Sequence, residues 1–218
     1  MRLTPTHIQA ACRHLRRADP VMKSVIKEVG PYTLRFDRDR FGMLVRSIIS
    51  QQISTSAAAS IHGRLVALVG TAGLTAAGIS RFTPDQLRTA GLSPQKASYV
   101  ADLARKVRDG DVQLRNIGRL PDEQVIEQLT QVKGIGRWTA QMFLIFSLGR
   151  PDVFPHDDLG VRAAIRDRYG LKDLPDKETS HAIAANWRPY ASVASWYCWQ
   201  SLDTAKDREK AKADTPSR

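Results

Sequence analysis

Cysteine is scarce in this sequence. The 218 residues contain only two, Cys12 and Cys198. Two cysteines cannot supply the four thiolates of an iron–sulfur cluster, nor can they form a metal knuckle. In a reducing cytoplasm, both are expected to be buried free thiols.

Long hydrophobic runs are also lacking. No apolar stretch approaches the roughly 20 residues that a membrane-spanning helix needs. Between Met1 and Pro20, basic and apolar residues are interleaved. A secretion signal would instead keep its basic, apolar and small residues in separate regions. We therefore expect a cytoplasmic protein with no membrane attachment.

Acidic residues are outnumbered by basic ones. The chain has 22 Asp and Glu against 33 Lys and Arg, which gives a formal net charge of +11. An excess of this size favours a polyanionic partner, and nucleic acid is the usual one. A solubilising surface is the alternative, because net charge steers encounters without specifying a target.

Strand patterns are scarce as well, and the sequence predicts an all-α fold. Apolar residues recur at three- and four-residue steps, as on the face formed by Phe41, Leu44, Val45, Ile48 and Ile49. Proline at the first helical position predicts helix starts at Pro84 and Pro94, the latter helix running to about Val107. Further helices are predicted from Pro121 and over residues 137–148, 159–169, 177–187 and 191–205. The polar stretch 206–218 is predicted to be disordered.

The segment from Leu129 to Ala140 is predicted to form two helices joined by a glycine hairpin. Gly134 and Gly136 let the backbone turn sharply and leave amide N–H groups uncovered. Such amides at the start of the second helix could bind a phosphate of a DNA backbone without contacting bases. The alternative is a plain turn between two packed helices. A dinucleotide fingerprint is disfavoured, because the preceding segment is helical.

Asp158 directly precedes an apolar-periodic helix. A residue in that place is expected to cap the helix. The field of the helix also keeps a carboxylate at its start ionised, so capping and catalysis are compatible there. Asp157 is assigned a structural role, and it is the alternative cap.

The order of these motifs resembles the helix-hairpin-helix base-excision DNA glycosylases, within them most closely the 3-methyladenine-DNA glycosylase II branch. The resemblance rests on the hairpin 134–140, followed by 153–154 and by the aspartates 157–158. Residues 41–54 are similar to the family's first long helix and wedge loop, and residues 187–197 to its C-terminal segment. The combined spacing of hairpin and aspartate is specific, whereas each piece alone is not.

The resemblance spans roughly residues 15 to 204 and implies two helical domains with the active site in a cleft between them. Residues 38–149 would form the central domain, and residues 1–37 and 150–205 together the second. It implies a monomer that binds double-stranded DNA containing damaged bases, in the cytoplasm and associated with the nucleoid. We expect no N-terminal β-domain of the kind that some members carry, because the helical core begins close to the first residue of this sequence.

The activity implied is that of a DNA glycosylase that flips alkylated purines, such as 3-methyladenine and 7-methylguanine, out of the duplex. It hydrolyses the N-glycosidic bond and leaves an abasic site for base excision repair. Asp158 matches the catalytic aspartate, whose carboxylate stabilises the positive charge that develops on the sugar. Trp138 stands where bifunctional relatives carry a lysine that forms a Schiff base. The enzyme is therefore expected to be monofunctional, without lyase activity.

The base pocket is expected to contain Trp138, Tyr190, Met142 and Leu159. Aromatic faces attract a cationic base by roughly 0.5–2 kcal/mol, and Trp138 and Tyr190 are the candidates for stacking. Met142 and Leu159 stand where some relatives carry tyrosine, which makes this pocket less aromatic. Ala191 differs too, since relatives often have arginine there. The alternative for Trp138 is a core aromatic.

The DNA-binding residues implied are Gln52, Gln51, Lys133, Gly134, Gly136 and Arg137. Gln52 matches the wedge that fills the gap left by the flipped nucleotide, and the adjacent Gln51 is the alternative.

A monovalent cation is the one cofactor considered. The resemblance implies that the backbone carbonyls of Thr130, Val132 and Gly134 bind it in the hairpin. No cofactor is expected to be required for the reaction, and no iron–sulfur cluster is expected.

Three alternatives remain open at this point. The hairpin could serve a DNA-binding protein without catalysis, since phosphate contacts bind without chemistry. The dipeptide His156-Asp157 could belong to a metal-dependent phosphohydrolase, although metal clusters need several convergent ligands. A mismatch-directed glycosylase on the same fold would change the substrate and keep the reaction.

Overall fold

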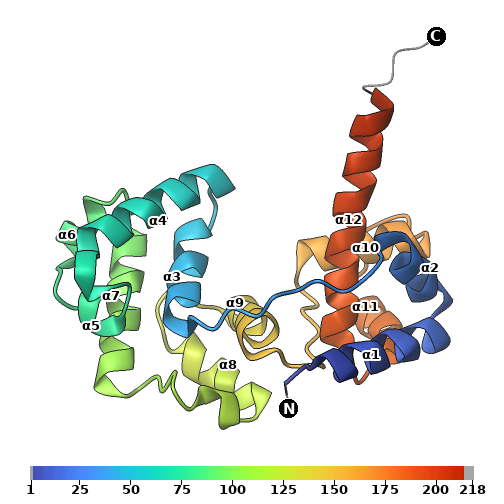
Figure 1. The fold of residues 1–218 in the computed structure, drawn as a ribbon, viewed down its shortest axis with the longest axis horizontal. Helices are drawn as coiled ribbons and strands as arrows, with labels where there is room; N and C mark the ends of the chain where they lie inside the picture. The colour runs from blue at the N-terminus through green and yellow to red at the C-terminus, as the bar shows by residue number, and fades with distance from the viewer. Residues whose placement is uncertain (1, 214–218) are drawn as a thin grey trace. The chain divides into compact units, whose positions relative to one another are not determined.

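The structure, a computed structural model, describes the backbone of residues 2–213 and the side chains of residues 2–204. Within these residues every regular element is a helix, which confirms the predicted all-α class (Figure 1). Contacts divide the chain into two compact units. The central unit is Phe36–Leu148, and the terminal unit combines the chain up to Arg35 with the chain from Gly149. The predicted domain boundaries stay a prediction.

The central unit begins with two long helices joined by a short turn and ends with the hairpin. Its helices are α3 (Arg40–Ser50), α4 (Thr55–Val69), η1 (Gly70–Ala72), α5 (Ala76–Ile79), α6 (Pro84–Arg88), α7 (Pro94–Asp109), η2 (Ile117–Arg119), α8 (Asp122–Thr130), α9 (Arg137–Phe143) and the π-helix η3 (Leu144–Leu148). Local signals set two of these starts as predicted: Thr83 and Ser93 cap α6 and α7, each with proline at the first position.

Helix α3 lies at the centre of this unit and packs against α4, α7 and α9. Its predicted apolar face is confirmed, because Phe41, Leu44, Val45, Ile48 and Ile49 are all buried. Burying one such side chain contributes about 1.5–3 kcal/mol, so this face anchors α3 and the turn that follows it.

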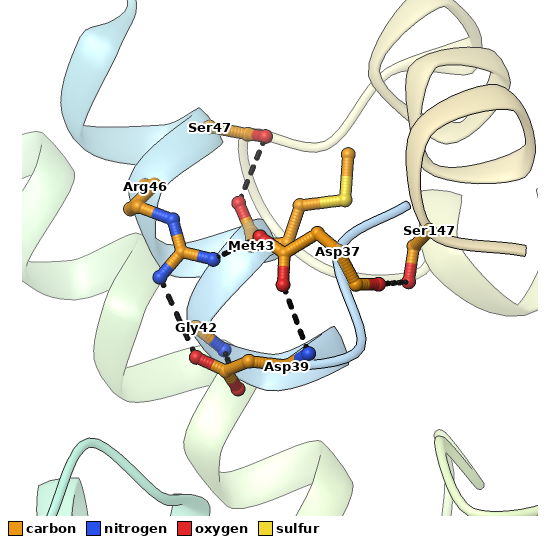
Figure 2. A network of polar contacts seen from close by, with 7 residues as sticks. All are labelled: Asp37, Asp39, Gly42, Met43, Arg46, Ser47 and Ser147. Atoms are coloured by element: carbon orange, nitrogen blue, oxygen red, sulfur yellow. Dashed lines mark hydrogen bonds and ion pairs between the residues drawn. The ribbon is translucent and has the colours of Figure 1, made fainter. Parts of the chain in front are cut away.

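A polar network fixes the start of α3 (Figure 2). The Asp39 carboxylate caps the helix by accepting a hydrogen bond from the Gly42 N–H at 2.9 Å. Arg46, two turns on, pairs with both Asp37 and Asp39. The Ser147 hydroxyl donates to the Asp37 carbonyl at 2.9 Å. The network therefore ties the start of α3 to the end of the hairpin's second helix.

That second helix differs from its prediction. The sequence indicated one helix over residues 137–148, whereas the α-helix ends at Phe143 and a five-residue π-helix follows. The residues of the π-helix include no proline or glycine that would indicate a change of helix type. The wider turn coincides with two bonds made outside the helix, by Ser147 and by the Phe146 carbonyl, which accepts from the Asp37 N–H at 2.9 Å.

The terminal unit comprises α1 (Pro5–Ala18), α2 (Pro20–Val29), α10 (Leu159–Tyr169), α11 (Lys177–Ala184), η4 (Ala185–Trp187) and α12 (Ala191–Ala213). Helix α12 packs against α1, α2 and α10. None of the helices among the described residues has the length and apolar character to span a membrane.

Helix α12 corrects one prediction. Residues 206–213, for which the sequence predicted disorder, continue this helix. The stretch consists of Lys, Asp, Arg, Glu and Ala, and Pro216 is the first residue that would break a helix. Extending an existing helix through such residues costs little, although the stretch is polar. Residues 214–218 of the predicted tail lie outside the described residues.

A buried carboxylate joins three helices of the terminal unit. Asp19 is 3% exposed and caps α2 by accepting from the N–H groups of Val21 and Met22. Its other oxygen accepts from the indole Nε1 of Trp187 at 3.0 Å and from the Tyr169 hydroxyl. These donors satisfy the oxygens of the buried carboxyl group, which would be costly to bury without hydrogen-bond partners.

Both cysteines are free thiols, as predicted. Cys198 is buried, and burial raises the pKa of its thiol to about 12. Cys12 is only partly buried, against the prediction, with its sulfur 3.5 Å from the Tyr197 hydroxyl.

Candidate functional site

Asp158 is the N-cap of α10, as its place in the sequence predicted. Its Oδ1 accepts a hydrogen bond from the Val161 N–H at 2.8 Å, and the residue is 8% exposed. The alternative that Asp157 caps the helix is wrong. The Asp157 side chain is 69% exposed and lies 3.2 Å from His156 Nε2.

A second donor reaches the same carboxylate oxygen. The indole Nε1 of Trp199, on α12, donates to Asp158 Oδ1 at 2.8 Å. The two donors come from different helices, so α10 and α12 together fix the orientation of the carboxylate. Sequence reasoning missed Trp199, which lies 41 residues from Asp158 and in a helix whose pattern gives no sign of this contact.

Gly160 makes room for this indole. A Cβ at position 160 would lie 3.0 Å from Trp199 Cδ1 and 3.1 Å from Asp158 Oδ1. Both distances are tighter than ordinary contacts between such atoms. A glycine in the first turn of α10 was the one sequence signal that something approaches Asp158 closely.

The loop before Asp158 is held on both sides. The Val153 N–H donates to the Ser192 hydroxyl at 2.9 Å, and the Asp158 N–H donates to the Pro155 carbonyl at 2.9 Å. Phe154 meets Trp187 edge-on, with ring centroids 5.6 Å apart. The backbone that delivers Asp158 to α10 is thus anchored in the terminal unit.

The alternative of a metal-dependent phosphohydrolase finds no support in the part of the chain that the structure describes. There, no group of three or more His, Cys, Asp or Glu residues could hold a metal ion. His156 instead lies beside Asp157 and beside the ring of His181, with ring centroids 5.0 Å apart.

The four predicted pocket residues divide between the two units. Leu159 is 67% exposed beside Asp158, and Tyr190 is half-buried with its ring 5.6 Å from that of His14. Trp138 and Met142 lie on α9 of the central unit. Met142 is buried, whereas Trp138 is 45% exposed, so the alternative that Trp138 is a core aromatic is wrong.

The hairpin between α8 and α9 forms the sharp turn that the sequence predicted. Gly134 has φ 80°, and a Cβ there would lie 2.0 Å from Tyr99 Cδ2. Glycine is therefore required for two independent reasons. Gly136 is the N-cap of α9, has no capping side chain and is exposed. A Cβ on Gly136 would meet no atom within 4 Å.

Charged residues brace the hairpin. Asp102 accepts a hydrogen bond from the Lys133 backbone N–H at 2.9 Å and pairs with Arg105. Burial alone would raise the pKa of this carboxyl, but those two bonds, together with the positive charges of Lys106 and Arg105, outweigh burial and lower the pKa. Arg137, a predicted DNA contact, makes two hydrogen bonds to Glu123 at 2.6 and 2.9 Å.

The two glutamines of the predicted wedge loop behave differently. Gln52 is exposed with φ 57°, in the left-handed region. Gln51 is half-buried, and its Nε2 donates to the Gly134 carbonyl at 2.8 Å. Sequence reasoning missed two residues here. Ile53 is 38% exposed beside Gln52, and Lys96 donates to the carbonyls of Ile49 and Gln51 at 2.7 and 2.6 Å.

Two of the three carbonyls predicted to bind a cation accept hydrogen bonds. The Val132 carbonyl accepts from the Ile135 N–H at 3.1 Å, and the Gly134 carbonyl accepts from Gln51. Each carbonyl oxygen has two lone pairs, so these bonds are compatible with a cation. The cation site, including Thr130, stays a prediction.

Comparison with protein families finds one match over most of the chain. Residues 45–189 match the family described as "HhH-GPD superfamily base excision DNA repair protein". The matched range includes the wedge loop, the hairpin and Asp158.

Curated relatives align along nearly the full chain. DNA-3-methyladenine glycosylase 1 of Schizosaccharomyces pombe is 32% identical over 205 residues, covering 92% of this chain and 90% of the relative. DNA-3-methyladenine glycosylase of Saccharomyces cerevisiae is 36% identical over 242 residues, covering 90% and 80%.

Solved structures share the fold. The S. pombe 3-methyladenine DNA glycosylase Mag1, in complex with abasic DNA, superposes with a TM-score of 0.77 at 33% identity, covering 88% of this chain and 95% of that one. DNA-3-methyladenine glycosidase of Bacillus halodurans gives 0.82 at 33% identity, covering 90% and 91%.

Proposed function

This chain belongs to the helix-hairpin-helix superfamily of base excision DNA repair proteins, and we propose that it is a DNA glycosylase for alkylated purines. Its substrates are purines of the 3-methyladenine and 7-methylguanine type in duplex DNA. One observation carries the proposal: a nearly buried carboxylate, Asp158, is held through Oδ1 by donors from two helices. This carboxylate belongs to a chain that aligns over nine-tenths of its length with a DNA-3-methyladenine glycosylase.

The chemistry assigned to Asp158 is electrostatic. As the bond between the base and C1′ breaks, its electron pair leaves with the base and the sugar gains oxocarbenium character. A fixed carboxylate stabilises that charge without reorganising during the reaction. Water then bonds to C1′ and releases a proton, which leaves an abasic site.

The reaction stops at that site. A lyase step needs an amine that attacks C1′ and forms a Schiff base. Position 138, where the family resemblance places that amine in bifunctional members, carries an indole. We therefore assign a monofunctional hydrolase.

Recognition of the base uses its charge. N-alkylation gives 3-methyladenine and 7-methylguanine nucleotides a positive charge, and aromatic faces attract cations by roughly 0.5–2 kcal/mol. The 45% exposure of Trp138 supports its role as a stacking residue. Tyr190 is the second candidate, and Met142 and Leu159 complete the proposed pocket.

DNA binding is assigned to the hairpin and to the loop between α3 and α4. Amides at Gly134 and Gly136 suit a phosphate, with Lys133 and Arg137 nearby. Gln52 is the wedge that fills the space of the flipped nucleotide. We further propose that the protein acts as a monomer on double-stranded DNA, in the cytoplasm at the nucleoid. A monovalent cation on the carbonyls of Thr130, Val132 and Gly134 would stabilise the hairpin.

The test is incubation with methylated duplex DNA, followed by chromatographic identification of the bases released. We expect 3-methyladenine and 7-methylguanine in the soluble fraction and abasic sites in the DNA. Binding of the DNA without release of any base would instead support the non-catalytic alternative.

A further inference from the structure

The turn between α3 and α4 holds an uncommon backbone conformation. Gln52 is the one non-glycine residue with positive φ among the residues that the structure describes. Side chains other than glycine rarely adopt this region, and they persist there only when the surroundings hold them. The same turn exposes Gln52 and Ile53 next to each other.

Lys96 holds the turn through its backbone. Its ammonium group, on α7, donates to the carbonyls of Ile49 and Gln51 at 2.7 and 2.6 Å. The last carbonyls of a helix have no partner within the helix, and a cation at that end is favoured by the helix dipole. Burial lowers the pKa of Lys96, which agrees with an ammonium partly enclosed against α3.

Gln51 holds the turn through its side chain. Its Nε2 donates at 2.8 Å to the carbonyl of Gly134, 83 residues further along the chain. The turn is therefore attached to the hairpin through the Gln51 side chain and to α7 through the carbonyls of Ile49 and Gln51. None of these bonds uses the side chains of Gln52 or Ile53.

We propose that Lys96 and Gln51 are positioning residues for base extrusion. They keep the turn in the conformation that presents Gln52 and Ile53 to the base stack, and they act without contacting DNA. Ile53 would add an apolar surface of the kind that proteins insert between base steps. The inference rests on the proposed function, in which Gln52 is the wedge.

The experiment measures base extrusion separately from chemistry. 2-Aminopurine is placed next to an alkylated adenine analogue in one strand of a duplex, with thymine opposite each, and its fluorescence reports unstacking upon binding whether or not hydrolysis follows. Lys96→Met and Gln51→Leu are compared with wild type, with thermal melting as the check on folding. Lys106→Met on the same helix removes an equal charge and is the matched control.

We expect Lys96→Met and Gln51→Leu to reduce the fluorescence change several-fold, and Lys106→Met to leave it unchanged. In a Gln52→Ala background, Lys96→Met should add less than about a twofold further loss, because residues that act through one another are not additive. Excision from single-stranded DNA should stay within about twofold of wild type, since no stack must be held open there.

Two results would overturn the proposal. Additive losses in the Gln52→Ala background would show that Lys96 acts independently of the wedge. A salt dependence of DNA affinity (log affinity against log salt) that is weaker by about one in slope for Lys96→Met would show that Lys96 contacts a phosphate directly. If the wild type unstacks the reporter but releases no base, the proposed function fails while the positioning role stands.

Discussion

The indole of Trp199 donates to the same oxygen of Asp158 that caps α10, and both bonds measure 2.8 Å. An N-cap carboxylate needs only one backbone donor, so the second bond does more than terminate a helix. It holds the group to which we assign the stabilisation of charge on the sugar. Gly160 preserves the space for the indole.

Trp199→Phe should slow base release while leaving DNA binding intact. A hydrogen bond to a charged group contributes about 1.5–3 kcal/mol, which corresponds to roughly 10- to 100-fold in single-turnover rate. The measurement compares that rate with the Kd for the same duplex.

Trp187→Phe is the matched control, because Trp187 makes the same kind of bond to the buried N-cap carboxylate of Asp19. Loss of the Trp187 bond should lower the melting temperature, with a smaller effect on the rate of base release than Trp199→Phe has. A Trp199→Phe enzyme that melts early and turns over normally would assign Trp199 to stability alone.

Gly134→Ala and Gly136→Ala should differ in their effect on stability. Gly134 has φ 80° and no room for a Cβ, so alanine there should cost about 1–3 kcal/mol in the free energy of unfolding. At Gly136 the Cβ meets nothing, and the loss should stay below about 1 kcal/mol.

Gly136→Ala should weaken DNA binding more than Gly134→Ala does, once the loss of folded protein is allowed for. A methyl group on exposed Gly136 stands where a phosphate would approach the first amides of α9. Urea melts and titrations of an undamaged duplex measure the two effects. Equal affinity of Gly136→Ala and wild type would argue against the hairpin as a phosphate site.

Borohydride should trap no covalent complex between the enzyme and damaged DNA. The indole at position 138 cannot form the Schiff base that borohydride reduces. Gel analysis should show intact abasic strands, which break only on alkaline treatment. A trapped complex would point to a lysine, Lys133 first, and would end the monofunctional assignment.

Cationic alkylpurines should be released faster than neutral lesions such as hypoxanthine or ethenoadenine. The charged base is already a good leaving group, whereas a neutral one benefits from protonation by a general acid. Single-turnover release from duplexes with one lesion each gives the comparison. Faster release of neutral lesions at neutral pH would require an acid, and His156 would be the first residue to replace.

The sequence predicted those parts of the fold that depend on neighbouring residues. Helix α10 and its cap at Asp158 follow from a capping residue and an apolar period, which act over a few positions. The hairpin follows from two glycines. The spacing of the motifs also predicted the family, and the match of the family model to residues 45–189 confirms that prediction.

Contacts between distant segments could not be predicted. Trp199 meets Asp158 across 41 residues, and Gln51 meets Gly134 across 83. The residues around Trp199 and Gln51 do not indicate these partners, because helix periodicity shows which face of a helix is buried and not which segment covers that face. The polar composition of residues 206–213 predicts disorder, whereas their helix propensity allows α12 to continue through them.

We assign to Asp158 the stabilisation of positive charge on the sugar as the glycosidic bond breaks. Asp158→Asn keeps the size of the side chain and an oxygen that can accept from Val161 and Trp199, but it removes the negative charge. The most direct measurement is single-turnover release of 7-methylguanine from a duplex by this variant, alongside its Kd for that duplex. We predict that release falls to background while the Kd stays near the wild-type value. Release at the wild-type rate would remove Asp158 from the mechanism.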